Sequence, residues 1–291
     1  MTYLLCFLIR AFHVLRVPQE IADPAPPSTS FKADEDFHKV AQGRCVDLLV
    51  AHTKRAPWLD KAFKGALKVT SVREPVTRAT SSYLHGVSCG AKCAMCHKLL
   101  DDQVKWARRC KDVADAQFEL VKGSASDPGD AVDNYDLVVV TDRFWESLVV
   151  LRHVLGVALA EVLYIDPDGA GADHSVPLSD QPSRFLDVVA SRNQLDRELY
   201  DAANTALDEK IGIVGKGAVR REAAELRLMQ ELAQHACTDP QRAHELMGKS
   251  YNFRKDCLWH DQGCGHHCLM QWATMYEAAR ASKVEESADK A

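Results

Sequence analysis

The 291-residue sequence has no excess of basic residues, no uninterrupted apolar run long enough to cross a membrane, and no internal repeat. Its 36 lysines and arginines are outnumbered by 41 aspartates and glutamates, and the net charge is −5. Bulk charge therefore gives no reason to expect nucleic-acid binding, although a local site for an anionic ligand is compatible with it. With 46% hydrophobic and 26% charged residues, the composition is that of one large globular domain or two ordinary ones.

The N-terminal segment, residues 1–17, is apolar but is interrupted by Arg10 and Arg16. A membrane-spanning helix needs about 20 predominantly apolar residues, and the segment also lacks the n-region and cleavage site of a good signal peptide. The helical spacing of its large apolar side chains favours an amphipathic helix instead. Residues 18–36 are rich in Pro, Ser, Asp and Ala and predict a linker. We therefore expect a helix and linker over residues 1–36.

Three short apolar runs predict buried strands over residues 45–51, 67–72 and 137–140. Segments with helical character follow them, and this alternation is typical of an α/β fold with a parallel sheet flanked by helices. Ligands in such folds bind at the carboxyl ends of the strands. The residues that directly follow the three runs are His52, Arg73 and the pair Thr141-Asp142. These positions are the first candidates for a functional site.

The remaining pattern predicts helices over 58–64, 74–85, 99–121, 145–155, 183–190, 195–211 and 218–236. Pro75 suits the first turn of one of them, because the missing N–H of proline costs little there. Gly156 is expected to close another. A polar loop is expected over residues 123–134, with Asp127-Pro128-Gly129 as its turn. The chain is expected to end in a charged tail over residues 281–291.

Ten cysteines are unevenly spread along the chain. One cluster contains Cys89, Cys93, Cys96 and Cys110, and another contains Cys237, Cys257, Cys264 and Cys268. Such clusters indicate either disulfides in an oxidising compartment or a metal site. The segments Cys89-x3-Cys93-x2-Cys96-His97 and Cys264-Gly265-His266-His267-Cys268 could each supply zinc ligands, although neither has the spacing of a standard zinc finger. The spacing alone leaves both alternatives open.

The most informative motif is VREPVTRATSSY at residues 72–83, which places an arginine at the end of a predicted strand and a proline at the start of a helix. Ser81 follows Arg73 by eight residues, which is about two helical turns. The planar guanidinium of Arg73 suits a phosphate, and the hydroxyl of Ser81 could add a donor. Taken alone, the pattern also fits an ordinary helix start with a surface arginine.

This motif resembles the 3′-phosphate-binding motif of sulfotransferases that use 3′-phosphoadenosine 5′-phosphosulfate as the sulfuryl donor. In that family the arginine and the serine eight positions later hold the 3′-phosphate, which implies the same role for Arg73 and Ser81. Residues 135–148, YDLVVVTDRFWESL, resemble a strand and helix of the galactose-3-O-sulfotransferases, and the turn is related to that of the uronyl 2-O-sulfotransferases. Residues 193–204, which include NQLD and LYD, are similar to a later segment of the same family.

The resemblance implies a P-loop-like sulfotransferase fold over residues 37–280 and sulfuryl transfer to a hydroxyl of a glycan or glycolipid, with galactose-type acceptors slightly favoured. In the uronyl 2-O-sulfotransferases a histidine at the corresponding strand end acts as general base, which implies this role for His52. A neutral imidazole can take the proton of an attacking hydroxyl. Taken alone, His52 fits a strand-end histidine that only packs or caps better than a base, and the resemblance makes the two alternatives equal.

The resemblance also implies a location. Galactose-3-O-sulfotransferases suggest the lumenal side of the Golgi membrane, with membrane association through an anchor outside this chain and no nucleic-acid partner. A lumenal location favours disulfides over zinc. We therefore expect the cysteines of both clusters to be mostly disulfide-bonded, and we expect no metal.

The chain departs from this family at its start. Family members begin with a strand and a Lys-Thr-x-x-x-x-Thr-type loop that binds the 5′-phosphosulfate, and no such loop precedes Cys45. We expect the first strand and loop to be missing from this chain, in which residues 4–10 resemble the helix that follows the loop. Without these donors turnover is expected to be weak or absent, whereas nucleotide binding should persist. The alternative function is a catalytically inactive, cysteine-stapled relative that acts as a lumenal binding module.

Overall fold

The structure is a computed structural model that describes residues 67–89, 102–110, 113–165, 178–252, 255–256 and 265–288. The expected helix and linker over residues 1–36, the expected strand over 45–51 and the candidate base His52 lie outside the described residues. Among the helices in the described ranges, none combines the length and the apolar character needed to span a membrane.

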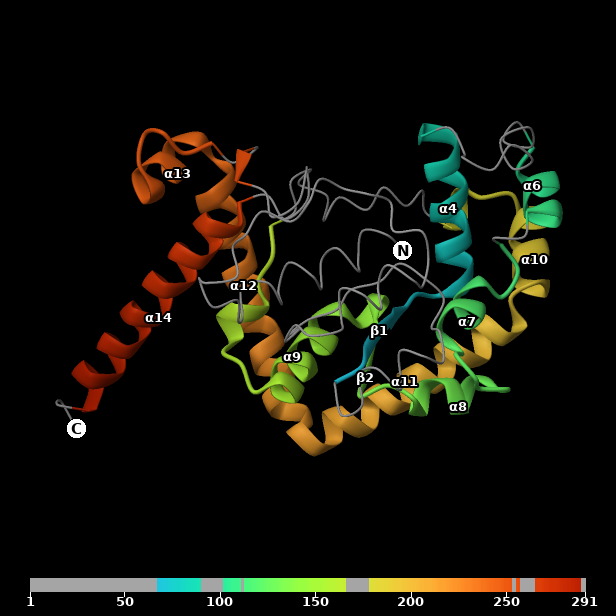
Figure 1. The fold of residues 1–291 in the computed structure, drawn as a ribbon, viewed down its shortest axis with the longest axis horizontal. Coiled ribbons are helices and arrows are strands. Elements are labelled where there is room, and N and C mark those ends of the chain that lie inside the picture. Colours follow the sequence, from blue (N-terminus) through green and yellow to red (C-terminus); the bar gives the residue numbers. More distant parts are fainter. Residues whose placement is uncertain are drawn as a thin grey trace, which may run out of the picture.

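Two short parallel strands, β1 (Val69–Val72) and β2 (Leu137–Val140), form the sheet of the described residues. Val69 lies opposite Leu137 at one end of the pairing, and Val72 lies opposite Val140 at the other. All four residues of β2 are buried, as expected for an apolar strand covered by helices. Figure 1 shows both strands near the middle of the described part, where α9 (Phe144–Leu155) and α11 (Gln194–Val214) pack against β2. The prediction of an α/β fold with a parallel sheet is confirmed.

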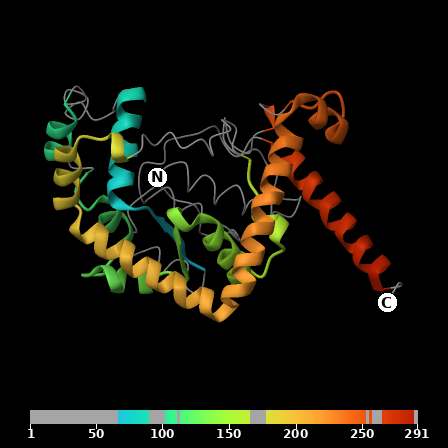
Figure 2. The same cartoon turned by 180° about the vertical axis from the view of Figure 1, so that it is seen from behind.

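The other elements surround this centre. They are α4 (Pro75–Cys89), α6 (Gln103–Arg109), α7 (Ala116–Val121), α8 (Pro128–Asp133), α10 (Ser183–Ser191), α12 (Lys216–Thr238), α13 (Pro240–Met247), α14 (His266–Ala288) and the 3-10 helices η3 (Thr141–Arg143), η4 (Leu159–Val162) and η5 (Leu178–Asp180). In Figure 2, α10, α11 and α12 form a continuous bracket, with α4 at one end and α13 and α14 at the other. Five of the predicted helices, 74–85, 145–155, 183–190, 195–211 and 218–236, are confirmed with small shifts of their ends.

The prediction of one long helix over residues 99–121 is wrong. In the described residues, α6 ends at the extended residue Cys110, and α7 begins only after Asp115, which has a left-handed φ of 43°. The physical reason is that the two helices pack into different hydrophobic clusters of the interior. Trp106 of α6 is buried in a small cluster with side chains of α4 and α10, whereas Phe118 of α7 is buried in the main core around β2. A single straight helix does not reach both.

The predicted turn at Asp127-Pro128-Gly129 is instead the start of α8. The side chain of Asp127 accepts a hydrogen bond from the backbone N–H of Asp130, and Pro128 occupies the first helical turn. An aspartate followed by a proline is as typical of a helix start as of a turn. The expected closure of α9 is confirmed, because Gly156 adopts a left-handed φ of 68° that favours glycine.

The C-terminal helices are joined by a disulfide. Cys237 near the end of α12 is bonded to Cys268 in the first turn of α14, at a sequence separation of 31. Cys110 is also disulfide-bonded. These bonds confirm the expected disulfides at three positions and exclude Cys268 from the predicted set of zinc ligands. Cysteines 93, 96, 257 and 264 lie outside the described residues. In Figure 1, α14 projects away from the other helices, and it continues past residue 281, where a charged tail was expected.

Candidate functional site

The carboxyl ends of the two strands lie side by side because the strands are parallel and in register. Arg73 and Glu74 follow β1, and Thr141 and Asp142 follow β2. A direct contact joins the two ends, since the backbone N–H of Glu74 donates to Oδ2 of Asp142 at 3.0 Å. We call these four residues the strand-end edge. Its place in the fold is the one where ligands bind in parallel α/β sheets.

Glu74 fixes the direction in which α4 leaves this edge. Its Oε2 accepts hydrogen bonds from the backbone N–H of Thr77 at 2.7 Å and from the Thr77 hydroxyl at 2.8 Å. Its Oε1 lies 2.6 Å from the guanidinium of Arg197 on α11. Partial burial acts to raise the pKa of Glu74, but the hydrogen bonds from Thr77 and the charge of Arg197 hold this pKa below its ordinary value overall. The carboxylate therefore caps α4 and ties it to α11.

Gln117 of α7 holds the backbone of Arg73 on both sides. Its side-chain Oε1 accepts from the Arg73 N–H at 2.8 Å, and its Nε2 donates to the Arg73 carbonyl at 2.9 Å. The side chain of Gln117 is fully buried and takes the role of a neighbouring strand at this position. The backbone of Arg73 is thus fixed, while its side chain is left for other contacts.

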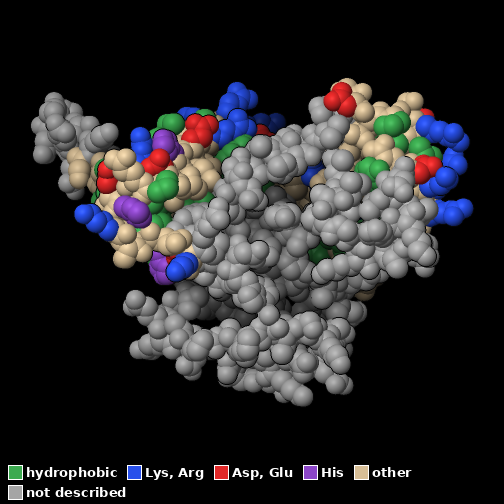
Figure 3. All heavy atoms as spheres, turned by 90° about the horizontal axis from the view of Figure 1, so that it is seen from above, with side chains coloured by type: hydrophobic (Ala, Val, Ile, Leu, Met, Phe, Trp, Pro, Cys, Tyr) green, Lys and Arg blue, Asp and Glu red, His purple; other side chains and the backbone are tan. Residues whose placement is uncertain are grey.

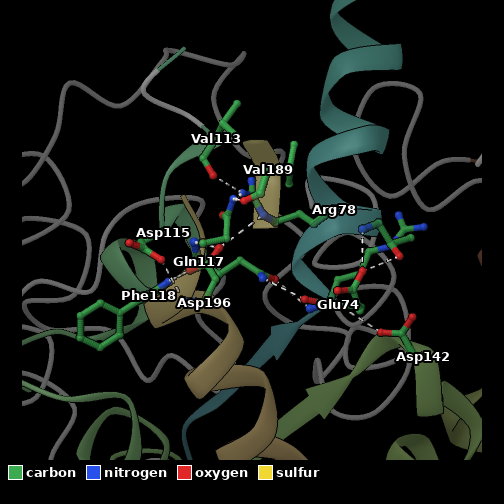
Figure 4. Close-up of polar contacts among 12 residues, drawn as sticks. Glu74, Arg78, Val113, Asp115, Gln117, Phe118, Asp142, Val189 and Asp196 are labelled. Atoms are coloured by element: carbon green, nitrogen blue, oxygen red, sulfur yellow. Dashed lines mark hydrogen bonds and ion pairs between the residues drawn. The ribbon is translucent and has the colours of Figure 1, made fainter. Parts of the chain in front are cut away.

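Asp196 of α11 contacts the backbone of Gln117 and so helps to hold this residue in place, as Figure 4 shows. Its carboxylate has no exposed surface and accepts the backbone N–H groups of Gln117 at 3.2 Å and Phe118 at 2.7 Å. These donors are the free N–H groups of the first turn of α7, so Asp196 acts as a cap supplied by another helix. Burial raises the pKa of Asp196, while the N–H of Phe118 and the charge of Arg78 act in the opposite direction.

Arg78 is the buried cation of this network. Its Nε lies 3.6 Å from Oδ2 of Asp196, and its Nη2 donates to the carbonyl of Val113 at 3.0 Å and to Oδ1 of Asn193 at 3.2 Å. The guanidinium joins α4 to the segment before α7 and to the start of α11 (Figure 4). The second arginine of the VREPVTRATSSY motif is therefore structural.

Of the two predicted phosphate-binding residues, Arg73 belongs to the strand-end edge and Ser81 lies farther along α4. Arg73 directly follows β1, and Ser81 is half-buried on α4, four residues after Thr77 and hence on the same helix face. Among the described residues, no hydrogen bond or ion pair engages the guanidinium of Arg73 or the hydroxyl of Ser81. The third predicted site residue, His52, lies outside the described residues.

Sequence reasoning missed the contribution of α11 to this edge. Arg197 contacts Glu74, and Tyr200 lies beside Asp142. Partial burial and the neighbouring carboxylate of Asp142 raise the pKa of Tyr200, so its hydroxyl stays protonated. Both residues lie in segment 193–204, whose similarity to a family segment was noted from the sequence. The helical periodicity of this segment does not show that it packs next to Asp142.

Two pockets lie on the described part of the molecule at different distances from this edge. A pocket of about 290 Å³ is lined by Pro75 and Val76 of α4 and by Arg197 of α11, next to the strand-end edge. A larger pocket of about 730 Å³ lies between α12, α13 and α14, and no predicted site residue lines it. We place the candidate site at the strand ends because the charged and hydrogen-bonding side chains gather there, although the larger pocket lies elsewhere.

The chain resembles known proteins of one family. The family model described as galactose-3-O-sulfotransferase matches residues 129–286. The chain is 34% identical over 103 residues to galactose-3-O-sulfotransferase 3 of Bos taurus, a match that covers 35% of this chain and 24% of the relative. It is 37% identical over 106 residues to the galactosylceramide sulfotransferase of Mus musculus, which covers 36% of this chain and 24% of the relative.

The matches to these relatives cover only part of each protein. The chain spans about a quarter of the length of the relatives. The residues that the family model matches include β2, Asp142 and Tyr200, and they begin after Arg73 and Ser81. No solved structure matches the chain significantly.

Proposed function

The chain belongs to the galactose-3-O-sulfotransferase family, whose model matches more than half of its residues, and we propose that the protein is a carbohydrate sulfotransferase. It transfers a sulfuryl group from 3′-phosphoadenosine 5′-phosphosulfate to a hydroxyl of a galactose-bearing glycan or glycolipid. The printed names of the relatives, which refer to galactose and galactosylceramide, support this acceptor class. The observation that carries the proposal is Arg73 at the carboxyl end of β1, with a guanidinium that has no partner among the described residues.

Arg73 and Ser81 hold the 3′-phosphate of the donor in this proposal. The guanidinium presents two parallel N–H groups to the phosphate oxygens, and the Ser81 hydroxyl adds a third donor from α4. Fixing the backbone of Arg73 through Gln117 reduces the conformational freedom that binding must remove. The neighbouring carboxylate of Glu74 is already engaged by Thr77 and Arg197, which limits its repulsion of the phosphate.

At the sulfur atom, the reaction forms one bond and breaks one. The acceptor oxygen attacks the sulfur in line, the bond between the sulfur and the bridging phosphate oxygen breaks, and adenosine 3′,5′-bisphosphate leaves. We assign proton removal from the attacking hydroxyl to His52, by its resemblance to the base of the uronyl 2-O-sulfotransferases. Catalysis of this kind consists mainly of positioning and of stabilising the charge that develops on the leaving group, as in phosphoryl transfer.

The finer assignments follow from the same family. We propose a P-loop-like sulfotransferase domain over residues 37–280, supported by the parallel pairing of β1 and β2. We also propose that the protein works on the lumenal side of the Golgi membrane. The disulfide between Cys237 and Cys268 supports an oxidising compartment of this kind.

The test combines binding and transfer. Titration calorimetry measures the affinity of the purified chain for adenosine 3′,5′-bisphosphate, and mass spectrometry detects sulfated product after incubation with the donor and either lactose or galactosylceramide. We expect saturable binding of the bisphosphate. Sulfated product identifies the enzyme. Binding without product fits the weak or absent turnover expected from the sequence and equally fits the cysteine-stapled binding module, whereas the absence of binding contradicts both functions.

A further inference from the structure

A second cluster of chemistry-bearing side chains lies at the start of α14, away from the strand-end edge. Asp256, His266 and His267 each offer one ligand atom, and these atoms all lie within 4.8 Å of one another. Oδ1 of Asp256 is 3.1 Å from Nδ1 of His266 and 2.5 Å from Nδ1 of His267. Figure 3 shows histidine side chains gathered at the end of the molecule that α12, α13 and α14 form. The sulfuryl transfer proposed above uses none of these residues.

The two oxygens of Asp256 have different surroundings. Oδ2 accepts hydrogen bonds from the hydroxyl of Tyr251 at 3.0 Å and from the backbone N–H of His267 at 3.1 Å. Oδ1 faces the two imidazoles. The carboxylate side chain is only 7% exposed, so its orientation is fixed by these contacts. This is the arrangement of a metal-binding carboxylate, in which one oxygen is held by outer hydrogen bonds and the other is directed at the ion.

Hydrogen bonding within the cluster leaves one nitrogen unsatisfied. Nδ1 of His266 is buried and has no hydrogen-bond partner of adequate geometry in the described part of the chain, although it lies close to Oδ1 of Asp256. The two imidazole rings are 3.8 Å apart, so two protonated rings here would repel each other. In a neutral ring, Nδ1 either donates its proton to Oδ1 or presents a lone pair there, depending on the tautomer. When both rings carry their proton on Nε2, the two Nδ1 lone pairs and a lone pair of Oδ1 face one another, and a bound cation accepts all three.

We propose that Asp256, His266 and His267 bind a divalent transition-metal ion, for which zinc is the best match. Zinc takes imidazole nitrogens and carboxylate oxygens at about 2.0–2.2 Å, whereas magnesium and calcium prefer oxygen ligands alone. Tetrahedral ligands at these distances are separated by about 3.3 Å, close to the separation between Asp256 and His266. The shorter contact to His267 lengthens easily, because that side chain is 65% exposed.

The position of the cluster at the N-terminus of α14 weakly disfavours cation binding, because this end of the helix carries partial positive charge. The carboxylate of Asp256 offsets that charge. Three protein ligands leave a fourth position for water. The ion would tie the segment of Tyr251 and Asp256 to the first turn of α14, next to the disulfide between Cys237 and Cys268. Its role is thus a cross-link between C-terminal elements, and it replaces the expectation that the protein binds no metal.

The test is a zinc titration of the full chain with disulfides intact and free thiols alkylated, in competition with a chromogenic chelator. We expect one zinc ion per chain. Asp256→Asn and His266→Gln remove a ligand each, and we expect both to weaken binding by more than 100-fold. Tyr251→Phe removes an outer hydrogen bond and should weaken it by about 10- to 100-fold. His153→Gln is the matched control, because His153 also contacts a carboxylate, that of Glu222 at 3.1 Å, and should leave zinc affinity unchanged.

Cobalt substitution identifies the ligand type. We expect the visible bands of a site with nitrogen and oxygen ligands and no near-ultraviolet charge transfer from a thiolate. If Asp256→Asn does not fold, His267→Gln serves as the second ligand variant, since its side chain is mostly exposed. The proposal is overturned if the chain binds no zinc, if the ligand variants bind it as tightly as the parent chain, or if thiolate bands dominate the cobalt spectrum. These outcomes are independent of nucleotide binding.

Discussion

Replacing Asp196 with alanine should destabilise the protein more than the loss of an ordinary ion pair. The change removes the carboxylate that is paired with the buried guanidinium of Arg78, and the side chains of this pair are only 6% and 0% exposed. Breaking a buried pair from one side costs about 3–5 kcal/mol, because an uncompensated charge stays in the interior. The backbone N–H groups of Gln117 and Phe118 also lose their acceptor, at about 1–3 kcal/mol for each group that stays dry. We expect a loss of at least about 3 kcal/mol.

The assay is urea unfolding followed by tryptophan fluorescence, with the free energy of unfolding and its denaturant slope compared between variants. Glu225→Ala is the matched control. Glu225 also forms an ion pair, with Arg280 at 2.6 Å, but the side chains of Arg280 and Glu225 are 50% and 32% exposed, and solvent-accessible pairs contribute about 0–1 kcal/mol. If Asp196→Ala costs no more than Glu225→Ala, the buried network of Figure 4 does not stabilise the fold as we argue.

A second substitution separates the charge from the cap. Arg78→Met removes the buried cation, so Arg78→Met combined with Asp196→Ala should be more stable than the sum of the two single losses implies. The loss that remains in the double variant contains the cap on α7 together with the hydrogen bonds that Arg78 donates to Val113 and Asn193. Affinity for adenosine 3′,5′-bisphosphate should also fall in Asp196→Ala, because Asp196 supports the residue that fixes Arg73.

Three further predictions follow from single contacts. Gln117→Leu leaves the N–H and carbonyl of Arg73 without their present partners, and we expect a loss of about 1–3 kcal/mol for each group in urea unfolding, together with weaker bisphosphate binding. Glu74 has a folded-state pKa below its ordinary 4.5, so its stabilising effect is present above that pH and is lost as the pH falls through the folded pKa. The stability difference between Glu74→Gln and the parent chain should therefore be largest near neutral pH and shrink in acid, and a constant difference would contradict the argument. Cys237→Ala combined with Cys268→Ala opens a loop with a sequence separation of 31, and chain entropy predicts a loss of about 3–4 kcal/mol, measured by unfolding without reductant.

The parts of the fold that could be predicted from sequence are those in which local pattern and burial agree. The apolar run LVVV predicts β2 correctly because its residues are buried on both faces and need no alternation. Helices α10, α11 and α12 keep one apolar face along their length, so their periodicity predicts them well. The single helix over 99–121 fails because periodicity does not reveal that Trp106 and Phe118 belong to different clusters.

Sequence reasoning located the candidate site only at the carboxyl ends of the predicted strands. Arg73 was selected because it directly follows a strand and lies eight residues before Ser81, and its binding role stays a prediction. The sequence did not show that the other arginine of the motif, Arg78, contacts Asp196 and Asn193. Partners 115 and 123 residues away in the sequence, such as Asn193 for Arg78 and Arg197 for Glu74, follow from tertiary packing alone. The pairing of Cys237 with Cys268 likewise needed coordinates, since spacing does not determine connectivity.

The central claim is that Arg73 and Ser81 bind the 3′-phosphate of the donor nucleotide. The most direct measurement compares the affinities of the parent chain, Arg73→Ala and Ser81→Ala for adenosine 3′,5′-bisphosphate and for adenosine 5′-monophosphate, which lacks the 3′-phosphate. Arg108→Ala on α6 is the control, because this arginine is exposed and distant in the sequence from the strand ends. A charged hydrogen bond is worth about 1.5–3 kcal/mol, so Arg73→Ala should weaken bisphosphate binding by roughly 10- to 100-fold, Ser81→Ala less, and neither should change monophosphate binding. Equal losses for both nucleotides, or no loss of bisphosphate affinity in Arg73→Ala, would contradict the claim.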